Sequence, residues 1–257
     1  SKLAELLSGA TKFGAAVESI DLSGCGLTGA TKDRYGMWQK IDSNMDGFIA
    51  LCAVLGKVRT VRLADCGLGA SSVAELSKIF SDATAVEAVV LKGNMITGST
   101  HVGYSFAKYD NDLSGIIALC EALPGLQKPI SLDLSNCGLS VKGVTEIAKA
   151  TSAGAAVVSV NCLANHFGDE GLATLLTAIE GTSVRSLCGL TEGQTTADFS
   201  GQNLSPIDCK ILAAEYDFRG FIAALTELDV RGNAALGEAA LAELRAVAPE
   251  TCKILTD

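Results

Sequence analysis

Residues 108–123, KYDNDLSGIIALCEAL, have the spacing of a calcium-binding loop. An EF-hand loop places oxygen ligands at positions 1, 3 and 5, a glycine at position 6 and a bidentate glutamate at position 12. Residues 110–121 match at every one of these positions. The candidate calcium ligands are Asp110, Asp112, Ser114 and Glu121.

Two related segments of the same chain lack this ligand set. Residues 42–53 end in alanine where the glutamate should stand, and residues 215–226 place Arg219 at position 5 and Thr226 at position 12. All three segments share a glycine followed by an apolar stretch, which is typical of a helix start preceded by polar capping residues. The stretch before residue 110 also lacks the helix that an EF-hand needs. Helix capping is therefore the preferred interpretation, and calcium binding through residues 110–121 is the alternative.

Other reactive constellations are missing from the sequence. His101 and His166 have no cysteine or carboxylate at metal-ligand spacing, and no HExxH, CxxC, GxSxG or phosphate-loop motif occurs. The nine cysteines are odd in number and several recur at matched places, which indicates reduced thiols that act as small apolar groups. We expect no enzymatic activity and no cofactor. We also expect an intracellular, cytoplasmic protein, with import into an organelle left open.

The composition is that of a folded protein with an acidic surface. Apolar residues make up 48% of the chain and charged residues 19%, which allows a large core. The net charge is −9 without a basic cluster, so we expect no nucleic-acid binding. Apolar runs stay far below the roughly 20 residues of a membrane span, and the first residues lack the layout of a signal peptide. No membrane insertion is expected.

A repeated pattern organises most of the chain. It has apolar residues at places 1, 4 and 6, asparagine or cysteine at place 9 and an apolar residue at place 11. Places 4 and 6 put two side chains on one face of a short strand, and place 9 lies where the chain turns inward. Segments between the copies, such as 71–80 and 170–179, have helical apolar spacing. The copies begin at residues 17, 58, 86, 129, 157, 184 and 225, and the copy at 184 is degenerate.

VESIDLSGCGL at 17–27 fits the pattern at every place, and PISLDLSNCGL at 129–139 misses only at Pro129. In these strands, and in its helical units of about 28 residues, the chain resembles the ribonuclease-inhibitor-like class of leucine-rich repeat proteins. Residues 186–233 resemble repeats of unicellular algae and other protists. The resemblance implies an α/β solenoid, a curved horseshoe with parallel strands on its concave face and helices on its convex face. It also implies a non-catalytic scaffold that binds a partner protein.

We therefore expect a single domain over residues 1–257 with about seven repeats. The longer intervals between copies predict inserts near 28–47, 97–115 and 190–220. The apolar spacing of the last segment predicts a C-terminal capping helix at 237–248.

The aromatic residues indicate where a partner could bind. All four tyrosines and the single tryptophan fall in the long intervals, and such side chains anchor many protein interfaces. In the alternative interpretation these rings seal their own enlarged repeats. The predicted contacts are Tyr35, Trp38, Tyr104, Phe106, Tyr109 and Tyr216 in the inserts, with Asp21, Arg62, Asp133 and Asp229 on the strand face. The predicted function is a protein-interaction scaffold, including the role of an accessory subunit in a larger complex.

Overall fold

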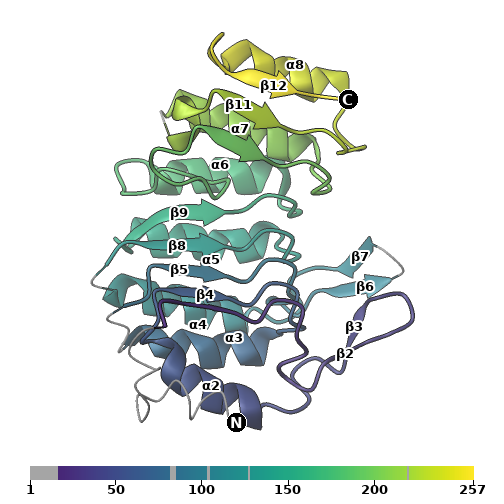
Figure 1. The fold of residues 1–257 in the computed structure, drawn as a ribbon, viewed down its shortest axis with the longest axis vertical. Helices are drawn as coiled ribbons and strands as arrows, with labels where there is room; N and C mark the ends of the chain where they lie inside the picture. Colours follow the sequence, from purple (N-terminus) through teal and green to yellow (C-terminus); the bar gives the residue numbers. More distant parts are fainter. Residues whose placement is uncertain (1–16, 82–84, 103–104, 127, 219) are drawn as a thin grey trace.

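The structure is a computed structural model that describes residues 17–81, 85–102, 105–126, 128–218 and 220–257. Short strands and helices alternate along the chain. The strands follow one another from the N-terminal to the C-terminal part of the molecule, and the helices lie behind them (Figure 1). The fold is therefore α/β, with parallel strands alternating with helices.

Parallel strands form two sheets. The larger one has five strands in chain order: β1 (Ser19–Asp21), β4 (Thr60–Arg62), β5 (Ala88–Val90), β8 (Ile130–Asp133) and β9 (Val157–Asn161). The smaller one has three strands: β10 (Thr196–Asp198), β11 (Glu227–Asp229) and β12 (Lys253–Leu255). The degenerate copy at 184 contributes only a single parallel bridge, from Ser186 to Ser159. The strand ladder is thus at its thinnest between the two sheets.

The helices cover one face of these sheets (Figure 1). They are α2 (Asp46–Leu55), α3 (Ala70–Ser77), α4 (Ser114–Ala122), α5 (Val141–Ser152), α6 (Gly168–Ile179), α7 (Pro206–Asp217) and α8 (Glu238–Val247). Short 3₁₀ turns lie at η2 (Lys78–Ser81), η3 (Leu123–Gly125) and η4 (Phe221–Ala224). The helices predicted within 71–80 and 170–179 are confirmed, and Val73, Leu76 and Leu175 on their apolar faces are buried. Burial of such stripes stabilises helices of this length far more than their intrinsic propensity does.

Asparagine at place 9 lies at an inward turn of the chain and hydrogen-bonds the backbone of two neighbouring units. The Asn94 Oδ1 accepts hydrogen bonds from the backbone nitrogens of Cys66 and Leu68 in the preceding unit, at 2.9 and 3.0 Å. Its Nδ2 donates to the carbonyls of Leu63 and Leu91, both at 2.7 Å. Asn165 and Asn233 make the same kinds of contact in later units. Each amide therefore satisfies buried backbone groups that would otherwise be costly to bury.

Two of the predicted inserts contain antiparallel hairpins. The first hairpin consists of β2 (Thr31–Lys32) and β3 (Trp38–Gln39), and the second of β6 (Thr100–Val102) and β7 (Ser105–Lys108). Both leave the body of the molecule at the same edge, seen on the right of Figure 1. Each is followed by a helix, α2 or α4.

The third predicted insert, near 190–220, is different. It contains β10 and α7, a strand and helix like those of the regular units. This unit departs from the repeat pattern at two places. Gln194 stands at place 1 instead of an apolar residue, and Gln202 stands at place 9 instead of asparagine or cysteine. Ala197 and Phe199 still occupy places 4 and 6, and both are buried.

Near the C-terminus, α8 lies within the range predicted for the capping helix, and β12 follows it. Among the described residues, no helix has the length and apolar content that crossing a membrane requires.

Candidate functional site

The edge that carries the two hairpins has several of the predicted site residues, among them Tyr35, Trp38, Tyr109 and Asp110. Each hairpin ends in an aspartate with a left-handed backbone, Asp42 at φ 56° and Asp110 at φ 51°. Aspartate tolerates this conformation because its short side chain can bond locally. In both cases the carboxylate reaches the start of the helix in the next unit.

The carboxylate of Asp42 lies at the start of α3. Its two oxygens accept hydrogen bonds from the backbone nitrogens of Gly69 and Ser72, each at 3.1 Å. The first turn of a helix has backbone N–H groups without partners inside the helix, and it favours negative charge. Asp42 therefore acts as a helix cap supplied from another unit, which ties the first hairpin to its neighbour.

Asp110 does the same at the start of α5. Its Oδ2 accepts hydrogen bonds from the Gly143 nitrogen at 2.8 Å and from the Ser140 Oγ at 2.5 Å, and the Ser140 nitrogen lies 3.2 Å away. The preferred interpretation of this segment, polar residues capping a helix, fits this geometry, although the helix that Asp110 caps is α5 and not α4. The sequence could not show this partner, because it lies 30 residues further on.

The four candidate calcium ligands do not form one cluster. The Asp112 Oδ1 accepts hydrogen bonds from the nitrogen and the Oγ of Ser114, at 3.0 and 2.6 Å, and these bonds lower the pKa of Asp112. Glu121 is exposed on α4. No group of three or more His, Cys, Asp or Glu side chains is placed to hold a metal in the described ranges.

Trp38 of the first hairpin packs onto the next unit. Its Nε1 donates to the Asp65 Oδ1 at 2.6 Å, and the Lys32 Nζ pairs with the other oxygen of the same carboxylate at 2.6 Å. The Lys32 ammonium also lies 4.7 Å from the centre of the indole ring. On the body side, a Cβ on Gly67 would lie 2.9 Å from the ring, so only glycine fits there. Trp38 thus ties the first hairpin to the unit that follows it, and its indole is engaged within the molecule.

Tyr35, at the tip of the same hairpin, points away from the body. Its side chain is 55% exposed, and the Arg34 guanidinium lies 4.5 Å from the centre of its ring. The turn beneath it is well defined, because the Asp33 Oδ1 accepts hydrogen bonds from the nitrogens of Tyr35 and Met37 at 2.8 and 3.0 Å. The hairpin therefore presents an aromatic and a cationic side chain together on an ordered turn.

The aromatic residues of the second hairpin region are described only in part. Tyr109 stacks on His166, with ring centres 4.8 Å apart and planes at 28°. Burial raises the pKa of Tyr109 and lowers that of His166. Phe106 belongs to β7, but its side chain lies outside the described parts of the structure, and Tyr104 lies outside the described residues altogether.

Tyr216, one of the predicted partner contacts, is buried in the structure. Tyr216 belongs to α7, its side chain is only 8% exposed, and its hydroxyl lies 3.4 Å from the Cys252 Sγ. Burial is the main cause that raises the pKa of Tyr216. The sequence places Tyr216 in an insert because the unit that contains α7 departs from the repeat pattern.

On the strand face, the four predicted charged contacts divide into two pairs. Asp21 and Arg62 are exposed. Asp133 is half-buried, and its Oδ1 accepts hydrogen bonds from the nitrogen and the Oγ of Ser135 at 3.0 and 2.6 Å. Asp229 is 9% exposed and paired with Arg231, whose hydrogen bond lowers the pKa of Asp229. The Asp229 carboxylate is therefore engaged by Arg231 within its own turn.

A covering of the strand face near β8 and β9 was not foreseen. Ser135 and Leu163, at place 7 of these units, are buried. A Cβ on Gly189 would lie 2.9 Å from the Cβ of Asn161, so the end of the degenerate copy packs against this side chain of β9. The Lys92 Nζ donates to the Gln202 Oε1 at 2.9 Å and thereby links the two sheets. The open part of the strand face is consequently the part nearer β1 and β4.

Sequence reasoning also missed a buried acid at the junction of the two sheets. The Glu215 carboxylate is fully buried, and its Oε2 accepts hydrogen bonds from the Leu187 nitrogen, the Ser186 Oγ and the Cys188 Sγ at 2.9, 3.2 and 3.1 Å. Burial raises the pKa of Glu215, and burial and the adjacent carboxylate raise the pKa of Cys188 well above its usual value. The contact resembles a thiol and its base, but a buried, protonated thiol is a poor nucleophile. An acidic residue inside the apolar stretch ILAAEYDF was the one signal for it.

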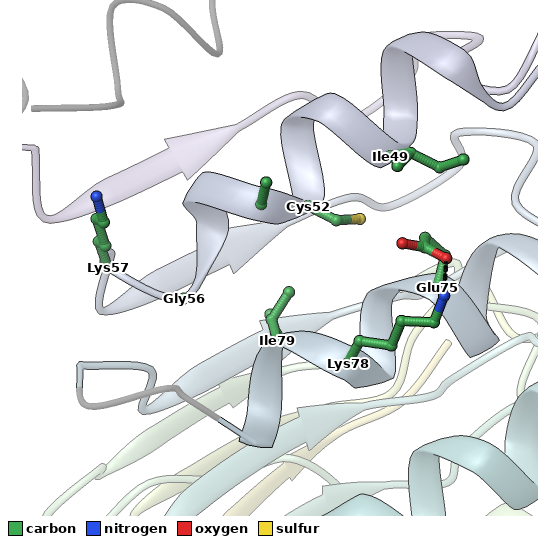
Figure 2. Close-up of a pocket in the computed structure, with 8 residues that line it drawn as sticks. Ile49, Cys52, Gly56, Lys57, Glu75, Lys78 and Ile79 are labelled. Carbon is green, nitrogen blue, oxygen red and sulfur yellow. Dashed lines mark hydrogen bonds and ion pairs between the residues drawn. The ribbon is translucent and has the colours of Figure 1, made fainter. Parts of the chain in front are cut away.

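A small pocket of about 280 Å³ lies between α2 and the end of α3. Ile49, Cys52 and Ile79 line it, beside the ion pair of Glu75 and Lys78 (Figure 2). Burial raises the pKa of Cys52 to about 12, so its thiol stays protonated at neutral pH. This thiol is therefore part of the packing between helices.

The comparisons with known proteins give one finding. A family model described as "Leucine Rich repeat" matches residues 130–148, which span β8 and the first two thirds of α5. The comparison with curated proteins found no match. Leucine-rich repeats are generally non-enzymatic modules that mediate protein–protein interaction. The match therefore supports a leucine-rich repeat family for this chain, in agreement with its parallel strands and alternating helices.

Proposed function

We propose that the chain is a single leucine-rich repeat domain of the ribonuclease-inhibitor-like class, a solenoid that binds a partner protein without catalysis. In this proposal it serves as an accessory subunit of a larger assembly, and the first hairpin makes the central contact. Arg62 and Asp21 on the open part of the strand face extend the contact surface.

The presentation of Tyr35 carries this proposal. Most large apolar side chains of the described residues are buried, whereas Tyr35 is 55% exposed at a hairpin tip. Tyrosine and arginine are enriched among residues that dominate binding energy at protein interfaces, and a pre-ordered turn reduces the entropy lost on binding. The hydrogen bonds of Asp33 below the tip and the anchoring of Trp38 behind it supply that order.

The cysteines support an intracellular setting. All nine are free, and burial raises the pKa of Cys66 to about 11 and that of Cys120 to about 12. Thiols that persist unpaired in this number fit a reducing compartment, such as the cytoplasm.

Site-specific photo-crosslinking tests the proposal. A photoreactive phenylalanine analogue replaces Tyr35 in one variant and Ala239, an exposed residue of α8, in a control variant. In native extract, position 35 should give a discrete adduct that position 239 does not give. Unlabelled wild-type protein should compete for this adduct, and an Arg34→Ala, Tyr35→Ala competitor should not. Equal adducts from both positions, or equal competition by both proteins, would contradict the proposal.

A further inference from the structure

A second surface lies away from the hairpins, where the degenerate unit interrupts the helix layer. Residues 184–195 run from the Ser186 bridge to β10 without a helix, whereas regular units have one. α6 packs closely on α5, and α7 packs closely on α8. Because no helix lies between them, α6 and α7 make few contacts with each other. A groove of about 610 Å³ remains between α6 and α7.

The floor of this groove is apolar. It is formed by the last turn of α6, by the segment that leads to the Ser186 bridge and by the last turn of α7. The floor residues are Leu176, Ile179, Val184, Ala214 and Phe218. Leu176, Ala214 and Phe218 are only half-buried, so part of their apolar surface faces solvent.

The rim of the groove is acidic. Glu180 follows α6 directly, and Asp217 ends α7, and both side chains are exposed. Within the described ranges neither carboxylate has an ion pair or hydrogen bond. Among the described residues that line the groove, Arg185 is the one basic side chain. Its Nη1 donates hydrogen bonds to the carbonyls of Thr182 and Val184, at 3.1 and 2.9 Å.

Helix ends add to this negative potential. A helix C-terminus carries a partial negative charge from its free carbonyls, which basic residues in the last turn usually offset. Neither α6 nor α7 has a basic residue in its last turn. A second hollow of about 480 Å³, lined by Thr151 and Ala178 among others, shares Glu180, Gly181 and Thr182 with the groove and extends it to the end of α5.

We infer that this groove binds a basic amphipathic helix of a partner protein. An apolar floor with acidic sides fits a helix that carries apolar residues on one face and lysine or arginine on both flanks. The groove and the second hollow together run from the end of α5 past α6 to the end of α7. A helix of about 14 residues, roughly 21 Å long, is a suitable length to probe this surface. This surface is separate from the hairpin edge, so the inference does not depend on the proposed function.

Binding of a designed peptide tests the inference. The probe is a fluorescein-labelled helix of about 14 residues with leucine at places i, i+3, i+4 and i+7 and lysine at the remaining places. Fluorescence polarisation should show saturable binding to the wild-type protein. A peptide of the same composition without helical spacing, and one with glutamate in place of lysine, should bind at least about tenfold more weakly.

Protein variants locate the binding. The double variant Glu180→Lys, Asp217→Lys should bind the peptide roughly tenfold or more weakly, because attraction between the rim and the peptide becomes repulsion on both sides of the groove. A matched control, Glu121→Lys with Glu250→Lys, changes the net charge equally at exposed sites outside the groove and should bind within about twofold of wild type. Ala214→Phe, which fills the groove without changing charge, should also weaken binding.

Circular dichroism confirms that each variant is folded before binding is measured. Equal losses in the rim variant and its control would show general attraction of a basic peptide to an acidic protein and would overturn the inference. Unchanged binding of the folded Ala214→Phe variant, or no binding to wild type, would overturn it as well. Variants of Arg34 and Tyr35 should bind this peptide like wild type, which keeps the two surfaces distinguishable.

Discussion

Asp110 shows how a single residue can match one motif and perform another task. Its carboxylate bonds the backbone nitrogens of Ser140 and Gly143 at the start of α5. A calcium ion at residues 110–121 would have to compete with these bonds for the same oxygens. Asp42 occupies the equivalent place in the first hairpin and caps α3 in the same way, although its own segment lacks the final glutamate.

Asp110→Ala should therefore destabilise the protein whether or not calcium is present. Loss of the cap at α5 should lower the free energy of unfolding by about 1–2 kcal/mol, measured by urea denaturation. Asp110→Asn keeps an acceptor oxygen, and asparagine tolerates the left-handed backbone, so this variant should lose less unfolding free energy than Asp110→Ala. The melting temperature of wild type should be the same in millimolar calcium and in chelator. A calcium-dependent rise that Asp110→Ala removes would instead support the EF-hand interpretation.

At the scale of elements, each hairpin is fixed to the unit that follows it. The first hairpin rests on Gly67 through the indole of Trp38, and on Asp65 through Trp38 and Lys32. The second is fixed through Asp110 at α5 and through Tyr109 on His166. Because these contacts reach the next unit, both hairpins hold neighbouring units together.

Gly67→Ala should separate the first hairpin from the body. The glycine has φ +66°, and an added Cβ would lie 2.9 Å from the Trp38 ring and 2.6 Å from the Cβ of Ala30. The left-handed backbone alone costs about 1–2 kcal/mol for alanine. We expect the unfolding free energy to fall by more than this backbone cost. We also expect a red shift in the fluorescence emission of Trp38, the single tryptophan.

The matched control for this variant is Gly93→Ala. Its φ is +73°, but the nearest atom to an added Cβ is 3.8 Å away. This variant should lose about 1–2 kcal/mol from the backbone cost alone and leave the tryptophan emission unchanged. If both variants shifted the emission equally, contact between Trp38 and Gly67 would not be what holds the hairpin.

The elements were predictable from the sequence where the repeat pattern was intact. Leu132 and Leu134 mark a strand by alternation, and Asn165 marks the inward turn, because burial imposes these residue types locally. The unit of β10 and α7 was missed because Gln202 replaces the place-9 residue and bonds Lys92 instead. The roles of Trp38 and Tyr216 depend on contacts 27 and 36 residues away, which a local pattern cannot encode.

At the scale of the whole molecule, the two sheets meet at the degenerate unit. A single bridge joins Ser159 to Ser186, and the buried Glu215 holds this unit through Ser186, Leu187 and Cys188. The groove between α6 and α7 lies behind the same junction. Repeat proteins gain their stability from contacts between neighbouring units. A junction with few strand contacts therefore affects how cooperatively the two sheets unfold.

The stability of this junction should depend on pH through Glu215. Burial raises the pKa of its carboxyl above the usual glutamate value, so the folded protein keeps a proton that the unfolded chain has already released. Stability should then fall as the pH rises from the usual glutamate pKa to the raised one. Glu215→Gln removes this titration, so the difference in unfolding free energy, wild type minus variant, should decrease across that range.

Urea denaturation at a series of pH values measures this difference. Asp208 and His166, whose pKa values are also shifted by burial, remain in both proteins and cancel. Weaker hydrogen bonds of the glutamine amide, compared with those of the carboxyl group, would change the unfolding free energy by the same amount at every pH. The dependence of the difference on pH is therefore unaffected. A difference that stays flat with pH would show that Glu215 is ionised in the folded protein as readily as in the unfolded chain.

The construction of the first hairpin has a practical consequence for protein engineering. Its base is fixed by Asp33 and Trp38, whereas Arg34 and Tyr35 at the tip project into solvent. Foreign residues grafted between Asp33 and Gly36 would therefore be displayed on a rigid support without disturbing the core. Under the proposed function, substitutions at this tip would change the choice of partner while the fold stays the same.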